Sequence, residues 1–286
     1  MDFEVTYMSG AGNLFSVVHF NQLPNEIDFS KIANLLCNIN EYNHFRTEGL
    51  IIILPNTIEN TDFNVLFYNP DGSTGMMCGN GGRCAVYYAL KKGYPCKYNQ
   101  FSLANIIYKY SIFEDQITLY FNPPQQFSPN VDIEIDENIS YIGDFVNVGT
   151  LHYVINYDDF IEELGSDFFN FDINNISIPI RNHIEFSPIG ANVNFYHIEN
   201  NNVFLRTFEK GVEAETGACG TGAISTAISL LWKKDLHPPI NIIPSSKEKL
   251  IVGFDFDGLK LSKIYLEGPA KILNQVNISI SDNLLI

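Results

Sequence analysis

The stretch EKGVEAETGACGTGA, residues 209–223, decides how this chain is interpreted, because an earlier stretch follows the same plan. That earlier stretch is NPDGSTGMMCGNGGRC, residues 69–84. Each contains a cysteine, Cys78 or Cys219, followed at once by glycine, a polar residue and glycine, and then by a segment that predicts a helix. One structural device therefore occurs twice, and we expect the chain to fold as two similar halves.

The device suits an anion and a reactive thiol. Its glycines let the backbone approach a ligand, and the helix start behind them offers N–H groups and the positive end of the helix dipole. Gly79 and Asn80, and likewise Gly220 and Thr221, would hold a carboxylate, while the same field favours a thiolate at the adjacent cysteine. Two such units facing each other would place a sulfur on either side of one carbon. That arrangement suits proton removal from one face and delivery to the other, which inverts a stereocentre.

The composition favours a small-molecule partner. The chain has 286 residues, and the 45% that are hydrophobic can build one large core or two ordinary ones. A formal net charge of −16 disfavours nucleic acid and anionic membrane surfaces as partners. The sequence has neither a charged start leading into an apolar segment nor an apolar run of membrane-spanning length, so we expect a cytoplasmic protein.

The cysteines indicate neither a disulfide framework nor a zinc site, because there are five of them and no Cys-x-x-Cys spacing. We interpret Cys37, Cys84 and Cys96 as small apolar fillers. The same interpretation is open for Cys78 and Cys219, but their shared Gly-x-Gly context favours catalysis. No metal and no cofactor is predicted.

Apolar alternation and turn residues predict a strand-rich first half. We expect strands at 4–8, 15–20, 50–54, 63–68, 106–113 and 116–121. An amphipathic helix capped near Ser30 should follow the second strand, and the helix after Cys78 should end at Gly93. The proline-containing segment 122–129 interrupts the pattern and is the predicted domain boundary.

The second half repeats the scheme, with strands at 145–148, 152–157, 193–198 and 203–208 before the second cysteine motif. A helix with Ile224, Ala227, Ile228 and Leu231 on one face follows, and then strands at 240–243, 250–256 and 259–266. The closing strand, after Pro269, should cross back to the first half. The predicted fold is α/β (α+β), with domains at 1–122 plus 267–286 and at 123–266, and with a ligand cleft between them.

Further polar residues are candidates for the site, each with an ordinary structural alternative. A lone histidine such as His152 is more often a satisfied structural residue, and Glu209 could equally be a solvated charge. A thiolate base needs polar partners to set its protonation state, which favours both residues once the cysteines are accepted as catalytic. Three asparagines beside glycine or proline turns either stabilise those turns or contact a polar substrate: Asn13, Asn69 and Asn192.

With these motifs the chain resembles the diaminopimelate epimerases, which convert L,L-diaminopimelate into the meso form without pyridoxal phosphate, for lysine and peptidoglycan synthesis. The similarity covers essentially the whole length, from Gly-Ala-Gly-Asn at 10–13 through both cysteine motifs to Gly-Pro-Ala at 268–270. It implies two pseudo-two-fold related halves, each a mixed β-sheet or barrel curled around a central helix, with the active site between them. It implies no metal or cofactor.

The resemblance also implies a role for each matching residue. Cys78 and Cys219 match the two catalytic cysteines, of which one abstracts the α-proton as a thiolate while the other, as a thiol, protonates the opposite face. His152 and Glu209 match their polar partners. The positions that match carboxylate-holding residues are Gly79, Asn80, Gly220 and Thr221, and those that match other substrate contacts are Asn13, Asn69, Thr150, Asn192, Glu209 and Lys210.

Five positions depart from the family pattern: Leu14 and Glu48 each stand where aspartate is expected, Thr150 and Leu151 replace Asn-Pro, and Lys210 replaces an arginine that clamps the distal carboxylate. Lysine pairs with a carboxylate as a point charge, without the bidentate fork of arginine. The chemistry is therefore better supported than the substrate.

Three hypotheses follow from the sequence. The first is a diaminopimelate epimerase, the second a racemase of another amino acid on the same scaffold, and the third a non-catalytic amino-acid-binding protein. Binding alone needs no second thiol, so the intact cysteine motifs favour the first two, and we prefer the first. The oligomeric state stays open, with a homodimer as one alternative.

Overall fold

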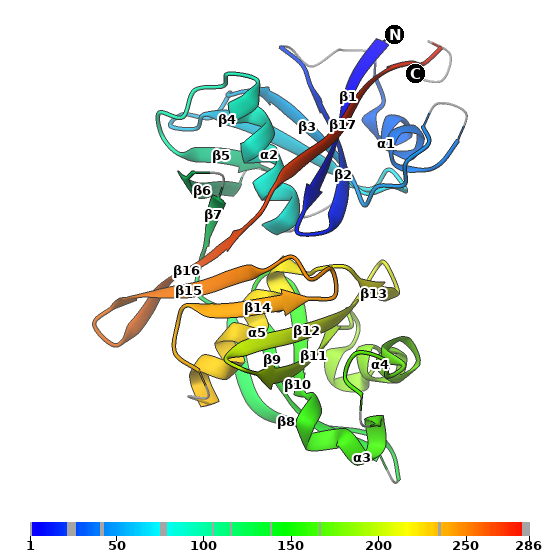
Figure 1. Ribbon diagram of the computed structural model, residues 1–286, viewed down its shortest axis with the longest axis vertical. Helices are drawn as coiled ribbons and strands as arrows, with labels where there is room; N and C mark the ends of the chain where they lie inside the picture. The colour runs from blue at the N-terminus through cyan, green and yellow to red at the C-terminus, as the bar shows by residue number, and fades with distance from the viewer. Residues whose placement is uncertain are drawn as a thin grey trace. The chain divides into compact units, whose positions relative to one another are not determined.

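The computed structural model of the chain describes residues 2–21, 27–40, 43–74, 79–104, 106–114, 116–137, 139–165, 167–233 and 236–281. The chain divides into two compact units. Unit 1 comprises Met1–Tyr120 and Glu267–Ile286, and unit 2 comprises Phe121–Leu266. In Figure 1 the blue to blue-green ribbon and the red closing strand belong to unit 1, and the green to orange ribbon belongs to unit 2.

Unit 1 contains β1 (Asp2–Gly10), β2 (Asn13–His19), α1 (Phe29–Cys37), β3 (Leu50–Pro55), β4 (Phe63–Tyr68), α2 (Gly79–Lys91), β5 (Gln100–Leu103), β6 (Ile106–Phe113), β7 (Gln116–Phe121) and β17 (Lys271–Ser279). The pairs β2–β3 and β4–β5 are parallel. The pairs β1–β2, β3–β4, β5–β6 and β6–β7 are antiparallel. β17 adds to the free side of β1 in antiparallel orientation, which confirms that the closing strand returns to the first half.

Unit 2 contains β8 (Gln126–Asp136), β9 (Ile139–Asn147), β10 (Leu151–Asn156), the 3₁₀ helix η1 (Tyr157–Phe160), α3 (Ile161–Leu164), α4 (Ile173–Arg181), η2 (Ile184–Phe186), β11 (Asn192–Glu199), β12 (Asn202–Glu209), β13 (Ala214–Thr216), α5 (Gly220–Lys233), β14 (Ile240–Pro244), β15 (Leu250–Asp257) and β16 (Lys260–Gly268). The pairs β10–β11 and β12–β14 are parallel. The pairs β8–β9, β9–β10, β11–β12 and β14–β15 are antiparallel.

The two units share one topology. The succession β1 to β6 in unit 1 has the same pattern of antiparallel and parallel pairs as β9, β10, β11, β12, β14 and β15 in unit 2. A parallel pair needs a crossover connection, and helices supply it at matching places. α1 and α4 connect the first parallel pair of each unit, and α2 and α5 connect the second. The duplicated cysteine motifs therefore mark a duplicated fold.

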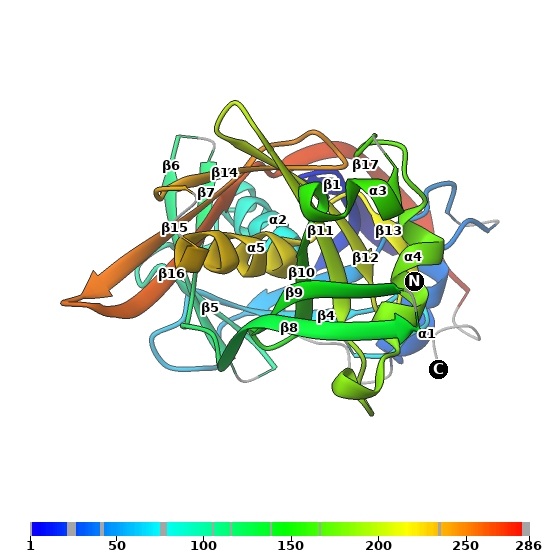
Figure 2. The same ribbon diagram turned by 90° about the horizontal axis from the view of Figure 1, so that it is seen from below.

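α2 and α5 are the central helices, because side chains on nearly every face of each are buried. α2 packs on β1, β2, β3 and β17, and α5 packs on β9, β10, β11, β14 and β15. Figure 2 shows α5 among these strands. The packing is close at the start of α2, where a Cβ on Gly10 of β1 would lie 2.4 Å from the carbonyl oxygen of Asn80. Each sheet thus wraps the helix that begins at its cysteine motif.

The expected strands and principal helices are present, and most of their ends lie within a few residues of the predicted ones. The strand predicted at 145–148 is longer than expected, because β9 begins at Ile139. The helix predicted near Ser30 begins at Phe29, and its N-cap is Asp28, whose carboxylate accepts from the Ser30 N–H at 3.0 Å. α2 ends at Lys91, two residues before Gly93, whose φ of +80° suits a helix C-terminal glycine.

The expectation that 122–129 only interrupts the pattern is wrong, because β8 begins at Gln126 and contains Pro129. A proline cannot donate to a sheet and is tolerated at bulges. The register between β8 and β9 shifts between Ser128 and Val131, so Pro129 lies inside an irregularity of the pairing. α4, which contains Pro179, was also not predicted.

Among the cysteines interpreted as fillers, Cys37 and Cys84 are buried, as predicted. Burial raises the pKa of Cys37 to about 12, so this thiol stays protonated at neutral pH. The interpretation is wrong for Cys96, which is exposed. It lies in the connection between α2 and β5, beside Pro95, where the chain runs over the surface.

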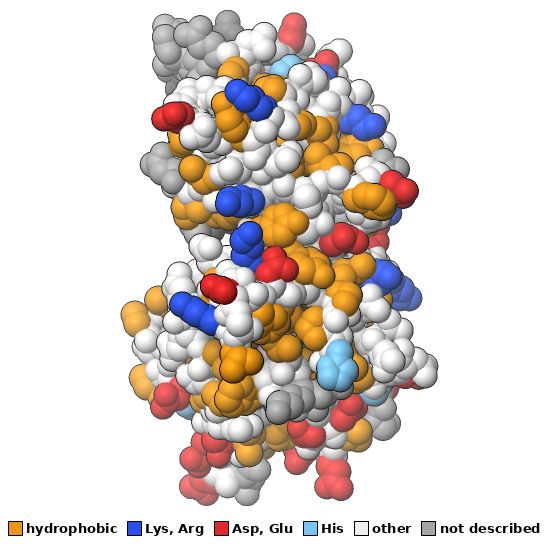
Figure 3. Space-filling view, turned by 90° about the vertical axis from the view of Figure 1, so that its left-hand side faces the viewer, with side chains coloured by type: hydrophobic (Ala, Val, Ile, Leu, Met, Phe, Trp, Pro, Cys, Tyr) orange, Lys and Arg blue, Asp and Glu red, His pale blue; other side chains and the backbone are white. Residues whose placement is uncertain are grey.

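The described residues contain no helix long and apolar enough to cross a membrane. Acidic side chains gather toward the end of unit 2 that lies at the bottom of Figure 3. The segments η1 and α3 of unit 2 carry the acidic residues Asp158, Asp159, Glu162 and Glu163. Such a surface repels polyanions, in keeping with the expectation of a small-molecule partner.

Candidate active site

Cys219 lies immediately before α5 and is buried. The Gly222 N–H donates to its Sγ at 3.4 Å, and the Thr221 hydroxyl lies 3.5 Å from the same sulfur. Gly220 is the first residue of the helix. An N–H donor, a hydroxyl and the positive end of a helix dipole all stabilise a thiolate more than a thiol. The surroundings therefore suit a sulfur that loses and regains a proton.

Glu209, the last residue of β12, is the acidic partner of this sulfur. Its carboxyl group accepts a hydrogen bond from the Thr216 hydroxyl and lies near enough to Cys219 for the thiol to influence its pKa. Burial raises the pKa of Glu209, and Thr216 and Cys219 offset this only in part. Glu209 is half-buried and its carboxyl group has a hydroxyl partner, so it is not a freely solvated surface charge. A carboxyl group whose pKa is raised can hold a proton next to the thiol at a pH where free glutamate is ionised.

His152 is fully buried in β10 and reaches Cys219 through Thr221. Its Nε2 lies 3.0 Å from the Thr221 hydroxyl and 2.9 Å from that of Thr150. Burial lowers the pKa of His152 to about 3. The imidazole is therefore neutral at physiological pH, and it acts on the sulfur through a hydroxyl.

Thr150 and Asn192 contact the same histidine, and Lys210 contacts Asn192. The Oδ1 of Asn192 accepts from the backbone N–H of Lys210 at 2.8 Å, while its Nδ2 lies 3.3 Å from the Nε2 of His152. The residue Lys210 is exposed. Unit 2 therefore brings together the predicted residues Thr150, His152, Asn192, Glu209, Lys210, Cys219, Gly220 and Thr221.

In unit 1 the predicted residues Asn13, Gly79 and Asn80 belong to one series of polar contacts. Asn13 donates from Nδ2 to the Glu48 carboxylate, and its Oδ1 accepts from the Nδ2 of Asn80 at 3.0 Å. The Oδ1 of Asn80 accepts in turn from Arg83 at 2.6 Å, and Arg83 also donates to the carbonyl oxygen of Gly79 at 3.3 Å. The amides of Asn13 and Asn80 thus fix the start of α2. Cys78 itself lies outside the described residues.

Asn69 lies in a turn, as its structural alternative predicts. Its backbone carbonyl accepts from the Gly72 N–H at 2.9 Å, and its Nδ2 donates to the Ser73 hydroxyl at 3.0 Å. The side chain is therefore engaged within its own loop. Among the described residues, the structure does not bring Asn69 into the chain of contacts that joins Asn13 to Arg83.

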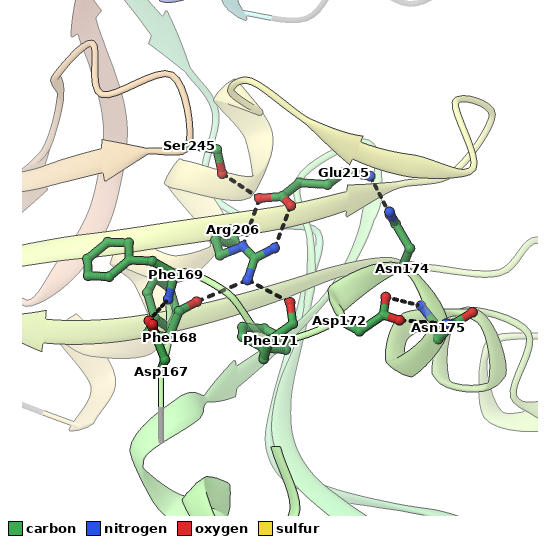
Figure 4. A network of polar contacts seen from close by, with 10 residues as sticks. All are labelled: Asp167, Phe168, Phe169, Phe171, Asp172, Asn174, Asn175, Arg206, Glu215 and Ser245. Atoms are coloured by element: carbon green, nitrogen blue, oxygen red, sulfur yellow. Dashed lines mark hydrogen bonds and ion pairs between the residues drawn. The ribbon is translucent and has the colours of Figure 1, made fainter. Parts of the chain in front are cut away.

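An ion pair in unit 2 holds the short strand that leads into the second motif (Figure 4). Arg206 of β12 binds Glu215 of β13 through two bonds, Nε to Oε1 at 2.8 Å and Nη2 to Oε2 at 2.6 Å. The Nη1 of Arg206 donates to the carbonyl oxygens of Phe168 and Phe171, both at 3.0 Å, and Ser245 donates to Glu215 at 2.6 Å. The clamp fixes β13, which carries the Thr216 that bonds Glu209.

Sequence reasoning missed Asn194, Arg206 and Glu215. Arg206 and Asn194 occupy buried positions in predicted strands, where polar residues are disfavoured unless they are paired. That contrast was the available signal for both residues. Glu215 gave no such signal, since the sequence around it predicts only a loop.

Within the ranges that the structure describes, no three or more His, Cys, Asp or Glu side chains are grouped as metal ligands could be. The carboxylates and thiols of the described site are instead engaged with hydroxyl, amide and backbone partners. What the described groups offer is proton transfer and the binding of an anion at a helix start.

Comparison with known proteins yields relatives over nearly the full chain, although no family model matches it. The chain is 35% identical to the diaminopimelate epimerase of Aquifex aeolicus, over 77% of this chain and 76% of that protein. It is 33% identical to the diaminopimelate epimerase of Chlorobaculum tepidum, over 96% of this chain and 100% of that protein. A probable proline racemase from Agrobacterium radiobacter shares the fold, with a TM-score of 0.73 at 12% identity, over 98% of this chain and 93% of that one.

Proposed function

This chain belongs to the diaminopimelate epimerase family, and from that membership we propose that it interconverts L,L- and meso-diaminopimelate in lysine and peptidoglycan precursor synthesis. It is an isomerase. The observation that carries the proposal is the setting of Cys219, a sulfur at a helix start with Glu209 beside it. A binding protein has no need for a thiol at a helix start with a carboxyl group beside it.

The proposed reaction uses two bases. Cys219 supplies one sulfur from the half at 123–266, and Cys78 supplies the other from the half at 1–122 plus 267–286. One sulfur, as a thiolate, takes the α-proton and becomes a thiol. The other, as a thiol, gives its proton to the opposite face of the carbon and becomes a thiolate. One C–H bond breaks, one forms, and no cofactor takes part.

We propose that the two helix starts stabilise the negative charge that develops on the substrate carboxylate. Gly220 and Thr221 lie in the first turn of α5, and Gly79 and Asn80 in the first turn of α2. The N–H groups at a helix start, together with the positive end of the helix dipole, favour an anion there. Loss of one well-placed donor of this kind typically costs about 100- to 1000-fold in rate. The chain therefore has the donors that the step requires.

The remaining contacts are proposed for the ends of the substrate distant from the reacting carbon. Asn13, Asn69, Asn192 and Lys210 are assigned to its amines and distal carboxylate. Thr150 is proposed to act mainly on His152, because its hydroxyl lies 2.9 Å from Nε2. The cytoplasm, which keeps thiols reduced, is the proposed compartment. A homodimer is the proposed assembly, which light scattering on the purified protein tests.

A racemase of another amino acid is the second candidate, and the exposed Lys210 favours it. A lysine in place of arginine offers a distal carboxylate one point charge, so the site discriminates less strongly for a substrate with two carboxylates.

The decisive experiment follows α-proton exchange in deuterated water under reducing conditions, with L,L-diaminopimelate and a panel of amino acids. Exchange with diaminopimelate alone supports the proposed function, and exchange with another amino acid alone supports the second candidate. Exchange with none of them refutes both and leaves a binding protein. Cys219→Ala should abolish exchange, whereas Cys96→Ala, which changes an exposed cysteine, should leave it unchanged.

Oxidation tests the pairing of the two sulfurs independently. Mild oxidant should join Cys78 and Cys219 in a disulfide and stop the reaction, and a reductant should restore it. Peptide mapping by mass spectrometry identifies the bond. A different pairing, or full activity after oxidation, contradicts the two-base proposal.

A further inference from the structure

Asn194 is a buried amide in the middle of β11, and it touches the ring of His152. Its Nδ2 lies 3.1 Å from the His152 Nδ1. Asparagine is unfavourable in a strand interior, and a buried amide costs free energy unless all its groups are paired. The amide therefore calls for a role that a hydrophobic residue could not fill.

Two neighbours fix which way the Asn194 amide points. The Thr207 hydroxyl donates to Oδ1 at 3.0 Å, and Nδ2 donates to the carbonyl oxygen of Tyr153 at 3.2 Å. A carbonyl oxygen accepts and never donates, so the group that faces it must be the NH₂. The same NH₂ faces the Nδ1 of His152. A neutral imidazole nitrogen that faces a donor must be the unprotonated one.

The other ring nitrogen has partners that can take a proton. The Nε2 of His152 lies 2.9 Å from the Thr150 hydroxyl and 3.0 Å from the Thr221 hydroxyl. The Asn192 NH₂ is also near, at 3.3 Å, and the Lys210 N–H orients that amide as a donor toward the ring. A neutral ring accepts a hydrogen bond at one nitrogen only. Either Asn194 or Asn192 can therefore donate to the ring, but not both. Asn192 makes the longer contact, at the nitrogen that has two hydroxyl acceptors.

From this geometry we propose that Asn194 is a positioning residue that holds the proton of His152 on Nε2, so that the ring donates to the hydroxyl next to Cys219. Thr221, when it accepts from His152, keeps its own proton for the sulfur 3.5 Å away. The chain of donors then runs from Asn194 through His152 and Thr221 to Cys219. Its end point is a stabilised thiolate.

The lowered pKa of His152, caused first by burial, agrees with a ring that stays neutral and carries one proton. The position of the Asn194 amide also explains why residue 222 is glycine. A Cβ there would lie 2.5 Å from the Asn194 Oδ1 and 3.2 Å from the Thr207 hydroxyl. The catalytic consequence rests on the proposed function, whereas the position of the proton does not.

Nitrogen-15 NMR of the whole protein tests the position of the proton directly. The ring nitrogens of His152, assigned by comparison with His152→Gln, should show a protonated Nε2 and an unprotonated Nδ1 at neutral pH. A protonated Nδ1 in the wild-type protein overturns the proposal, whatever the activity. This measurement needs no substrate, so its failure is separate from failure of the proposed function.

Asn194→Asp tests the role of the amide. A carboxylate accepts and cannot donate, so the His152 proton should move to Nδ1 in this variant. The rate of α-proton exchange should then fall about 100-fold, at the lower end of what a positioned proton-transfer group contributes. The matched control is Asn202→Asp at the turn end of β12, where Nδ2 donates to the Asn200 carbonyl. It should change neither the tautomer nor the rate.

Each outcome with the variants decides between the proposal and a merely structural role. If Asn194→Asp lowers the rate while the proton stays on Nε2, the amide acts on packing and the proposal fails. If Asn194→Asp does not fold, Asn194→Ser is used: its hydroxyl is too short to replace the amide bridge, so a mixture of the two tautomers is expected. An unchanged pure Nε2 tautomer in the serine variant refutes the positioning role.

Discussion

Glu215→Gln breaks the ion pair that fixes β13, and the structure sets the size of the effect. The wild-type carboxylate makes two bonds to Arg206, at 2.8 and 2.6 Å, and accepts a third from Ser245 at 2.6 Å. Glutamine keeps one acceptor oxygen but replaces the other by an NH₂ that faces the guanidinium. Arg206 therefore keeps its charge, its contacts to two carbonyl oxygens and its partly buried position without a counter-charge.

The expected loss of stability is intermediate between a surface and a buried ion pair. The side chains of Arg206 and Glu215 are 11% and 22% exposed. Exposed pairs contribute from 0 to about 1 kcal/mol, whereas removing one partner of a buried pair costs about 3 to 5 kcal/mol. We expect Glu215→Gln to lower the free energy of unfolding by about 2 kcal/mol, between those limits.

Urea unfolding followed by tryptophan fluorescence measures this, because the single tryptophan, Trp232, lies in α5 of unit 2. The matched control is Glu213→Gln, two residues away, where the glutamate pairs with Arg181 at 2.6 Å but is 50% exposed. The control should cost less than about 1 kcal/mol. Equal losses in the two variants would refute the assignment of Arg206 and Glu215 as a clamp.

The pH dependence of the same difference is a second check. Burial alone would raise the pKa of Glu215, but the bonds from Arg206 and Ser245 outweigh burial and lower it. A lowered pKa in the folded state contributes stability above the ordinary glutamate pKa of about 4.3, and this stability is lost as the pH falls through the folded value. The gap between wild type and Glu215→Gln should therefore be full at pH 7 and shrink below about pH 4. A gap that persists unchanged at acid pH contradicts the ion-pair explanation.

Three further outcomes are expected. The raised pKa of Glu209 contributes stability that is full below the ordinary glutamate pKa and is lost as the pH rises through the folded value. Glu209→Gln should therefore unfold at a higher urea concentration than wild type at pH 8 and at the same concentration at pH 4. The variant should also lose exchange activity. The two Gly-x-Gly motifs should respond differently to alanine. In Gly222→Ala the Cβ would lie 2.5 Å from an amide oxygen, so the free energy of unfolding should fall by about 1 to 3 kcal/mol. In Gly81→Ala the atom nearest the Cβ is 3.6 Å away, so urea unfolding should detect no loss of stability. Asp62→Asn should cost about 2 kcal/mol, because the carboxylate accepts from the N–H groups of residues 97, 98 and 100 and from a tyrosine hydroxyl, and an amide nitrogen cannot accept; an unchanged urea midpoint would refute this.

The sequence by itself determined most of the strands, the two central helices and the duplicated motif. Apolar alternation located the strands, and the Gly-x-Gly runs behind Cys78 and Cys219 located the starts of the two central helices. Residues such as Gly220 and Thr221 were found because their signal is local, a turn followed directly by a helix. The same local patterns sufficed to identify the family.

Only the tertiary structure decided which residues touch. His152 contacts Thr221, 69 positions away in sequence, and Asn194, 42 positions away. The local sequence pattern indicates neither contact. Pro129 predicts a break because its backbone cannot donate to a sheet, yet a shift in the register of β8 and β9 accommodates it. The exposure of Cys96 could not be predicted from local sequence either, since the burial of a cysteine depends on the segments that pack over it. The physical reason is common to all these cases: local sequence fixes backbone preference, whereas partners, burial and proton positions arise from strand pairing between segments far apart in the chain.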